Sequence, residues 1–333
     1  MTDLNQAPPA PATARLTGNT WVRFAARRAG RLVLSLWVLV TAAFLMIHLI
    51  PGDPVRAALG PTAPASLVAA RRADLGLDNP LPVQYVHYLR DVLSGDLGTS
   101  MTFNLPASRV IGDRLPATLQ LTLTAFAVAV VIAVPVGVLM GVLTRGGRAR
   151  RAELGFTGTS VVLGTIPDFL LGVVLVYVFG VSLGWLPVAG SAGASSYVLP
   201  VLSLAVGTAA VLARLLRVQM VTVLEADYIR TARAKRLSAA ALHVRHALPN
   251  ALTATITVGG LLLSSMVAGS VLVENVFAWQ GLGNTIVHSI LAKDYPLVQG
   301  IVLVYGLGVL LVNVVVDVAV ALLDPHSATI RES

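Results

Sequence analysis

The sequence predicts an all-α membrane protein with six transmembrane helices and a large external loop after the first helix. The 333-residue chain is 56% hydrophobic and only 12% charged, about half the charged share of an average soluble domain. Its charges fall in short blocks and leave several apolar runs of the roughly 20 residues that a spanning helix needs. The basic residues are also spaced along the chain as membrane topology requires.

Composition excludes several classes of function. The net charge of +8 would suit a nucleic-acid partner, but the basic residues lie where topology would place them. We therefore expect the basic residues to lie beside a lipid membrane, and we expect no nucleic-acid partner. The chain has no cysteine, so it has no disulfide, thiolate metal site or thiol nucleophile.

The N-terminal region predicts a tail and the first membrane helix. Residues 1–20 are rich in Ala, Pro and Thr and predict a disordered tail. Residues 21–50 begin with four arginines and continue as an apolar run from position 32, which predicts a transmembrane helix. A signal peptide also begins with basic residues that precede an apolar core, but its core is shorter and a small-residue cleavage site follows it. Here the turn-forming segment PGDP at 51–54 follows.

Residues 51–115 are amphiphilic and predict an extracytoplasmic segment. Within it, the stretch 75–97 has helical periodicity. One face of this predicted helix carries Tyr85, Tyr88, Leu89 and Leu93.

Residues 116–325 predict a five-helix core, and 326–333 predict a C-terminal tail. The apolar runs lie near 117–143, 156–182, 198–218, 252–273 and 297–322. Glycine and proline are frequent within them, and small residues let spanning helices approach closely. Gly137 and Gly141 form a GxxxG pair, for which packing within one subunit is the favoured interpretation and a subunit contact the alternative.

The distribution of basic residues predicts cytoplasmic N- and C-termini. With the N-terminus inside, the tail, the 144–153 loop, the 214–250 block and the C-terminus hold 17 of the 24 basic residues. The external loops at 183–197 and 274–296 hold none and one. The 51–115 segment places six arginines outside, but translocated segments of that length escape the positive-inside rule.

The stretch 227–252, DYIRTARAKRLSAAALHVRHALPNAL, is a basic and polar block between two apolar runs. Residues 225–234 are helix formers without Gly or Pro, and Ser238 can cap a second short helix from about Ala239. Pro249 suits the first turn of the next spanning helix. The predicted order of helix, bend, short helix and membrane suits a surface that a partner holds. The alternative is a plain basic loop that only fixes topology.

Ten short segments, in a fixed order, resemble one family of transport proteins. They are IPGDP at 50–54, LGLDNPLPVQY at 75–85, GDLGTS at 95–100, RLPATLQLT at 114–122, TIPDFLLG at 165–172, LGWLPVAG at 183–190, ARLLRVQMVTVLEADYIRTARAK at 213–235, VFAWQGLG at 276–283, DYPLVQG at 294–300 and VDVAVALLDP at 316–325. Each is weak alone, but ten in register are specific. The chain resembles the permeases of bacterial ABC importers of the dipeptide, oligopeptide and nickel family, and in particular the first of the two permeases of a peptide importer.

The resemblance implies the type I ABC importer permease fold. It also makes the basic block part of a cytoplasmic coupling loop at 219–250, the EAA loop, which receives an ATPase. The implied coupling residues are Asp227, Tyr228, Arg230, Thr231, Ala232, Arg233, Lys235, Arg236, Leu237, His246, Leu248 and Pro249. Two positions depart from the family pattern, because Arg236 stands at the loop's usual glycine and Gln280 at a common external proline. Either the bend at Arg236 uses ordinary dihedral angles or the coupling loop is altered.

The resemblance further implies a set of partners in the bacterial cytoplasmic (inner) membrane. These are a sister permease subunit, one or two ABC ATPase subunits and an extracytoplasmic substrate-binding protein. The 75–97 helix would contact that protein or shield the pore mouth, or would only pack on the bundle. The implied cargo is a short peptide, with nickel, opines, haem and glutathione as alternatives. Because GxxxxGK[ST] is absent, ATP and Mg²⁺ are expected on the ATPase subunits alone, and this chain is expected to bear no cofactor, metal or catalytic residue.

Three polar residues inside the apolar runs are candidates for the translocation path: Asp168, Asn313 and Asp317. A charge at the centre of a spanning helix is costly and faces protein or a water-filled path. Asp168, near the middle of the third run, would meet the amino terminus of a peptide, or else be a hydrogen-bonded structural carboxylate. Asp317 would otherwise pair with a basic residue near the cytoplasmic boundary. A proton-coupled transporter that uses both carboxylates is a remote alternative, because no repeat of two halves is visible.

Overall fold

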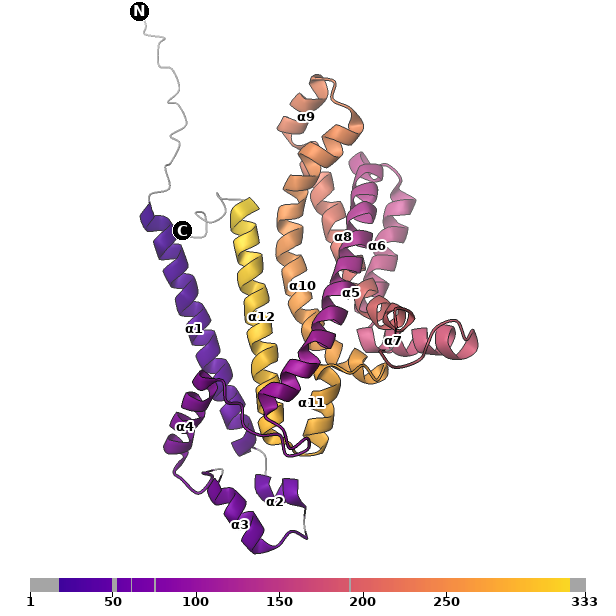
Figure 1. Ribbon diagram of the computed structural model, residues 1–333. Helices are drawn as coiled ribbons and strands as arrows, with labels where there is room; N and C mark the ends of the chain where they lie inside the picture. The colour runs from indigo at the N-terminus through magenta and orange to yellow at the C-terminus, as the bar shows by residue number, and fades with distance from the viewer. Residues whose placement is uncertain (1–17, 50–52, 61, 75, 192, 324–333) are drawn as a thin grey trace, which may run out of the picture.

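The computed structural model describes residues 18–49, 53–60, 62–74, 76–191 and 193–323 (Figure 1). Most of the predicted N-terminal tail and all of the predicted C-terminal tail therefore lie outside the described residues. Five helices are long: α1 (Gly18–Leu49), α5 (Ala107–Leu143), α8 (Ser195–Glu225), α10 (Leu248–Val276) and α12 (Tyr295–Leu323). The shorter helices are α2 (Pro54–Leu59), α3 (Ala65–Asp74), α4 (Leu81–Ser94), α6 (Arg150–Thr165), α7 (Asp168–Leu175), α9 (Asp227–Ala234) and α11 (Leu282–Leu291).

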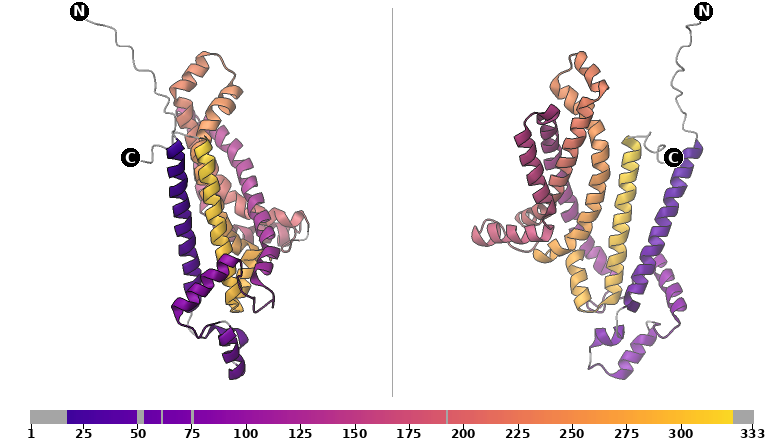
Figure 2. Two further views of the ribbon diagram at one scale, coloured as in Figure 1. Left: turned by 60° about the vertical axis from the view of Figure 1, so that its left-hand side comes forward. Right: turned by 180° about the vertical axis from the view of Figure 1, so that it is seen from behind.

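Helix α8 forms the centre of the bundle, with α5, α6, α7 and α10 packed around it (Figures 1 and 2). In its most apolar stretch 67% of α8 is buried, compared with 11% for α1 and for α12. Helix α12 packs on α10, and α1 packs on α12 at the edge of the molecule. Exposed apolar side chains on α1 and α12 therefore mark surfaces for lipid or for another subunit.

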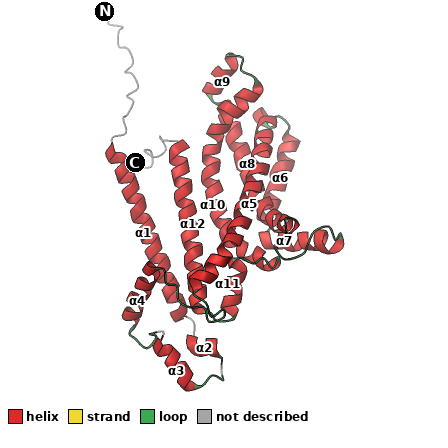
Figure 3. Cartoon of the chain, in the orientation of Figure 1, coloured by secondary structure: helices red, strands yellow, loops and turns green. Residues whose placement is uncertain are grey.

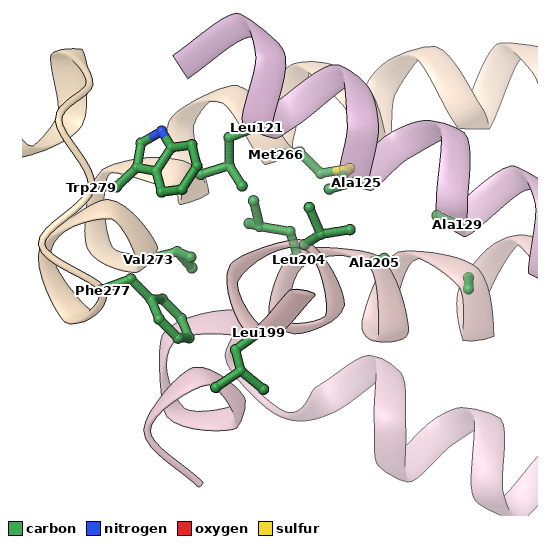
Figure 4. Packing of buried hydrophobic residues seen from close by; sticks show 12 residues of the cluster. Leu121, Ala125, Ala129, Leu199, Leu204, Ala205, Met266, Val273, Phe277 and Trp279 are labelled. Atoms are coloured by element: carbon green, nitrogen blue, oxygen red, sulfur yellow. The ribbon is translucent and has the colours of Figure 1, made fainter. Parts of the chain in front are cut away.

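The described chain is helical apart from loops and one isolated bridge between Thr99 and Pro106 (Figure 3). This confirms the predicted all-α class, since a chain in lipid must satisfy its backbone polar groups within helices or closed barrels. The main hydrophobic cluster lies where α5, α8 and α10 meet (Figure 4). There Phe277 and Trp279, just beyond the end of α10, pack with Leu121 of α5 and Leu199 and Leu204 of α8.

The third predicted span is broken in the structure. Five helices are long and apolar enough to cross a membrane, and a sixth span exists only if α6 and α7, bent by 95°, are counted as one. Pro167 causes the break, because a proline disfavours helical dihedral angles in the residue before it, and Ile166 is extended at ψ 125°. Asp168 therefore lies in the first turn of α7, directly after the break between the two halves of this segment, and not within one continuous helix.

The basic segments gather at one end of the bundle. The start of α1, the turn between α5 and α6, helix α9 and the end of α12 all lie there, whereas α2, α3, α4 and α11 lie at the opposite end (Figure 1). The six arginines of the segment 51–115 are matched by six aspartates. That segment therefore adds no net charge to its end of the bundle.

The segment 51–115 is anchored on the C-terminal half of α1. Tyr85 of α4 shares a 2.7 Å hydrogen bond with Thr41, and the rings of Tyr85 and Tyr88 pack on Phe44. Leu93, predicted on the same face, is instead 87% exposed. Helix α4 ends one residue later, at Ser94.

A salt-bridged turn orders the start of this segment. Asp53 caps α2 by accepting from the amides of Val55 and Arg56, and it pairs with Arg72 at 3.0 Å. Burial alone would raise the pKa of Asp53, but the hydrogen bonds from Arg72 and the two amides outweigh it, so the pKa lies below its ordinary value. Asp53 is therefore charged at physiological pH, as its pairing with Arg72 requires.

Gly137 and Gly141 bring α5 and α8 into direct contact. A Cβ on Gly137 would lie 2.9 Å from the carbonyl oxygen of Ala213, and one on Gly141 would lie 2.6 Å from the Cβ of Met220. Both helices belong to this chain, so the GxxxG pair serves packing within one subunit.

We expect Gly141→Ala to destabilise the protein by about 1–3 kcal/mol, because the added methyl group forces α5 away from α8. Gly155→Ala on α6 is the matched control, because its Cβ would meet nothing within 4 Å and alanine favours the helix. Denaturation of both variants in detergent measures the difference. Equal stabilities would show that α5 and α8 do not depend on this contact.

Candidate functional site

The basic block forms a protrusion at the end of the bundle where the basic segments gather (Figure 1). Helix α9 is held by Ile229, which is fully buried against Leu224 of α8. Leu242 and Ala247, from the helix that follows, complete this apolar anchor. The sequence analysis missed Ile229 and Leu242, although isolated apolar residues within a polar block are the signal that identifies such an anchor.

The predicted coupling residues divide by exposure. The exposed ones are Asp227, Tyr228, Arg230, Thr231, Arg233, Lys235, Arg236, Leu237 and Pro249, and the partly buried ones are Ala232, His246 and Leu248. The anchor therefore turns the charged side chains of α9 outwards. The block is a helical surface anchored on α8 and not only a loop between two spans.

The exposed surface of the block is cationic. Arg230 pairs with Asp227 on the same helix at 3.1 Å, whereas Arg233, Lys235 and Arg236 have no acidic partner among the described residues. Burial raises the pKa of Tyr228, so its phenol remains neutral at physiological pH. Such a surface suits a partner with an acidic groove.

The helix after the bend differs in part from the prediction. It starts at Ala239, and the Ser238 hydroxyl accepts a hydrogen bond from the Ala241 amide at 3.3 Å. The next turns, Ala241–Ala247, are π-helical and lead directly into α10, whose first turn holds Pro249. Because the backbone remains helical throughout, no loop separates the predicted short helix from the spanning helix.

Arg236 adopts the backbone conformation that usually requires glycine. Its φ is +57°, directly after Lys235 at the C-terminal end of α9. A non-glycine residue pays roughly 1–2 kcal/mol for this left-handed conformation. The bend therefore does not use ordinary dihedral angles; it keeps the left-handed geometry of a glycine bend and carries strain.

We expect Arg236→Gly to stabilise the bend by about 1 kcal/mol relative to Arg236→Ala, because only glycine relieves the strain. Both variants remove the same charge, so the comparison isolates the backbone. Hydrogen exchange of the 227–245 amides is the measurement. Faster exchange in the glycine variant than in the alanine variant would contradict the strain.

The three candidate path residues contact different helices. The Asp168 carboxylate lies over Gly207 of α8 and Gly269 of α10, within 3.5 Å of where their Cβ atoms would be. Asn313 accepts a 3.5 Å hydrogen bond from Ser264 of α10. Asp317 forms an ion pair with Arg28 of α1. No described hydrogen bond or ion pair joins Asp168 to the other two.

A buried carboxylate that the sequence analysis missed joins α10 to α5 and to the start of α11. Glu274 is fully buried and accepts hydrogen bonds from the Thr118 hydroxyl at 2.7 Å and from the Gly283 and Asn284 amides at 2.8 and 3.2 Å. The Trp279 indole donates to the Ala117 carbonyl at 3.1 Å. An acidic residue directly after the apolar run 252–273 was the available signal. These contacts join the motifs RLPATLQLT and VFAWQGLG in the folded protein.

A second buried carboxylate joins two other motifs. Asp294, fully buried at the start of DYPLVQG, accepts a 2.5 Å hydrogen bond from Ser100 of GDLGTS and a 3.0 Å hydrogen bond from the Thr102 amide. The Gly190 amide of LGWLPVAG donates to the Phe277 carbonyl at 2.9 Å. Residues of several motifs therefore form contacts between segments that are far apart in the sequence.

The fold and the protruding block define a helical membrane permease, and comparisons with known proteins identify its family. The model for "Binding-protein-dependent transport system inner membrane component" matches residues 133–328, and the model for the N-terminal part of such components matches 21–122. The chain belongs to this family of multi-pass ABC importer permeases of the inner membrane.

Individual relatives carry a more specific name. The chain is 40% identical over 305 residues to the glutathione transport system permease protein GsiC of Salmonella typhimurium, which covers 91% of this chain and 98% of that protein. The protein of that name from Pectobacterium atrosepticum is 40% identical over 295 residues, and that from Escherichia coli K12 is 38% identical over 305 residues. These matches cover 88% and 91% of this chain and 95% and 98% of the relatives.

A solved structure supports the type I ABC importer permease fold. An inward-facing structure of the MetNI methionine ABC transporter matches with a TM-score of 0.55 over 65% of this chain and 96% of that chain. Its sequence identity of 21% makes this a statement about the fold alone.

Proposed function

We propose that this chain is one permease subunit of an ATP-driven importer of short peptides, with glutathione as the first cargo to test. The 40% identity to glutathione transport permeases over nearly the full length carries the proposal, and glutathione is itself a tripeptide. Di- and oligopeptides share its charged ends and amide backbone. Nickel, opines and haem are the alternative cargoes.

The basic block is proposed as the contact for an ATPase subunit. In this scheme the chain and a sister permease form the path as a heterodimer, and a substrate-binding protein delivers cargo at the end that holds α2, α3 and α4. ATP and Mg²⁺ bind the ATPase subunits, whose closure moves α9 and switches the path between two states with different contacts. This chain performs no covalent chemistry, and both of its termini are cytoplasmic.

ATP hydrolysis by the reconstituted complex tests the cargo. The chain, its sister permease, the ATPase subunits and the binding protein are placed in liposomes and exposed to glutathione, a dipeptide, an oligopeptide or Ni²⁺. We expect glutathione or another short peptide to raise both ATP hydrolysis and uptake. Stimulation by Ni²⁺ alone would replace the peptide proposal by the nickel alternative. Transport by this chain without ATPase subunits would overturn the importer assignment and favour the proton-coupled alternative.

Asp168 is proposed to line the path and to contact the amino group of the cargo. Its carboxylate is half-buried beside two glycines of α8 and α10 and accepts no described hydrogen bond. We expect Asp168→Asn to lower uptake of glutathione about tenfold, since it removes an ion pair but keeps the size of the side chain. N-acetylated glutathione, which lacks the ammonium group, is the control and should be equally poor for both proteins. Unchanged uptake in the variant would exclude the path role.

A further inference from the structure

The turn between α5 and α6 carries a cluster of arginines that neither the packing nor the proposed coupling uses. Arg145, Arg148, Arg150 and Arg151 lie within seven positions of one another, and the last three are exposed. Three residues with positive φ, Gly146, Gly147 and Ala149, turn the chain sharply within this stretch. The turn therefore concentrates four positive charges at the ends of two helices.

The acidic residue nearest to this cluster in the sequence, Glu153, is already paired with a side chain of α8. Glu153 forms an ion pair with Arg217 at 2.5 Å. Arg217 also donates to the Thr144 hydroxyl at 2.9 Å, and Thr144 is itself buried. These contacts fix both ends of the turn to α8. They also leave the four arginines without an acidic partner among the described residues.

Apolar side chains border the arginines on both helices. Leu139 and Leu143 on the last turns of α5 are 57% and 46% exposed, and Leu154 on the first turn and a half of α6 is 64% exposed. The surface therefore changes from leucine to arginine at the point where the apolar run ends. A phospholipid has the same order of groups, with acyl chains next to a phosphate, and guanidinium groups bind phosphate in bidentate geometry.

We propose that this turn, which we call the 144–153 arginine turn, is a binding site for an anionic phospholipid. The phosphate binds Arg148, Arg150 and Arg151, and the acyl chains lie along Leu143 and Leu154. A basic cluster directly beside a spanning helix attracts anionic lipid, and Glu153 cannot neutralise this one while it is paired with Arg217. Because four charges exceed those of one phosphate, a lipid with two phosphates, such as cardiolipin, binds more tightly than phosphatidylglycerol.

The purified chain in detergent is sufficient for the test. Native mass spectrometry counts bound lipid after titration with cardiolipin, phosphatidylglycerol or phosphatidylcholine, and the apparent dissociation constant is measured at low and high salt. We expect the triple variant R148Q/R150Q/R151Q to bind cardiolipin at least tenfold more weakly, and high salt to weaken binding to the unmodified chain. All three residues are exposed, so the variant should fold, and a monodisperse elution profile verifies this.

The matched control removes three charges from the other basic surface. R233Q/K235Q/R236Q lies on the protruding block and not beside Leu143 and Leu154, and should retain cardiolipin with unchanged affinity. Equal loss in both triple variants would show attraction by net charge alone and would overturn the site. Unchanged lipid binding in R148Q/R150Q/R151Q would also overturn it.

Discussion

Reversing the charge of two residues on α9 is expected to abolish uptake. Arg233→Glu with Lys235→Glu changes the local charge by four on a surface where neither residue has an acidic partner among the described residues. If this surface meets an acidic groove of an ATPase, the variant places like charges against each other, which costs several kcal/mol. We expect uptake by the reconstituted complex to fall by tenfold or more, together with loss of the ATPase subunit from the purified complex.

The control is an equal charge reversal at the opposite end of the molecule. Its readout is retention of the ATPase subunit in the purified complex, because α4 lies at the end where the substrate-binding protein is proposed to deliver cargo. Arg90→Glu with Arg109→Glu also changes two exposed arginines. Substitutions at exposed positions usually change stability by less than about 0.5 kcal/mol, so both double variants should fold. Full uptake in the α9 variant would remove the basis for a coupling role of this block.

Replacing Glu274 by alanine is expected to give the largest loss of stability. The substitution leaves the Thr118 hydroxyl and the Gly283 and Asn284 amides without their acceptor in a buried site. Each buried donor left unsatisfied costs about 1–3 kcal/mol, so we expect a total loss of about 3 kcal/mol or more. Unfolding in detergent, followed by circular dichroism, is the measurement.

Two further variants show how much of the loss of stability comes from the buried hydrogen bonds of Glu274. Glu274→Gln keeps the size and one oxygen acceptor, so its loss of stability should be smaller than that of Glu274→Ala. Asp91→Ala on α4 removes an exposed carboxylate and should have little effect. If Glu274→Ala were as stable as the Asp91→Ala control, Glu274 would not hold α5, α10 and α11 together.

The sequence was sufficient to predict the class and most of the membrane architecture. The requirement for roughly 20 apolar residues per span is local, and the positions of α1, α5, α8, α10 and α12 follow from it. The predicted bounds of the helices were less accurate, since α5 begins at Ala107 and not near position 117. A helix can extend beyond the membrane, and hydropathy does not record where it does so. The family followed from ten motifs in order, which the comparisons confirmed.

The protruding block illustrates the limit of reasoning from sequence. Its charge, its helix and the cap at Ser238 were predicted, because these depend on neighbouring residues. The anchor formed by Ile229 and Leu242 was not predicted, since it depends on how α9 folds back onto α8. The backbone conformation of Arg236 was also left open. The identity of a side chain alone does not decide whether a bend adopts the left-handed conformation despite its strain.

The sequence by itself determined an all-helical membrane protein, because apolar length and charge placement are read along the chain, and its ten motifs indicated the ABC importer permease family. Only the tertiary structure decided the 95° break after α6, the pairing of Thr118 with Glu274 and that of Ser100 with Asp294. These pairs are separated by 156 and 194 positions. Burying a carboxylate requires donors from whichever segments pack around it, and that packing is a property of the folded bundle.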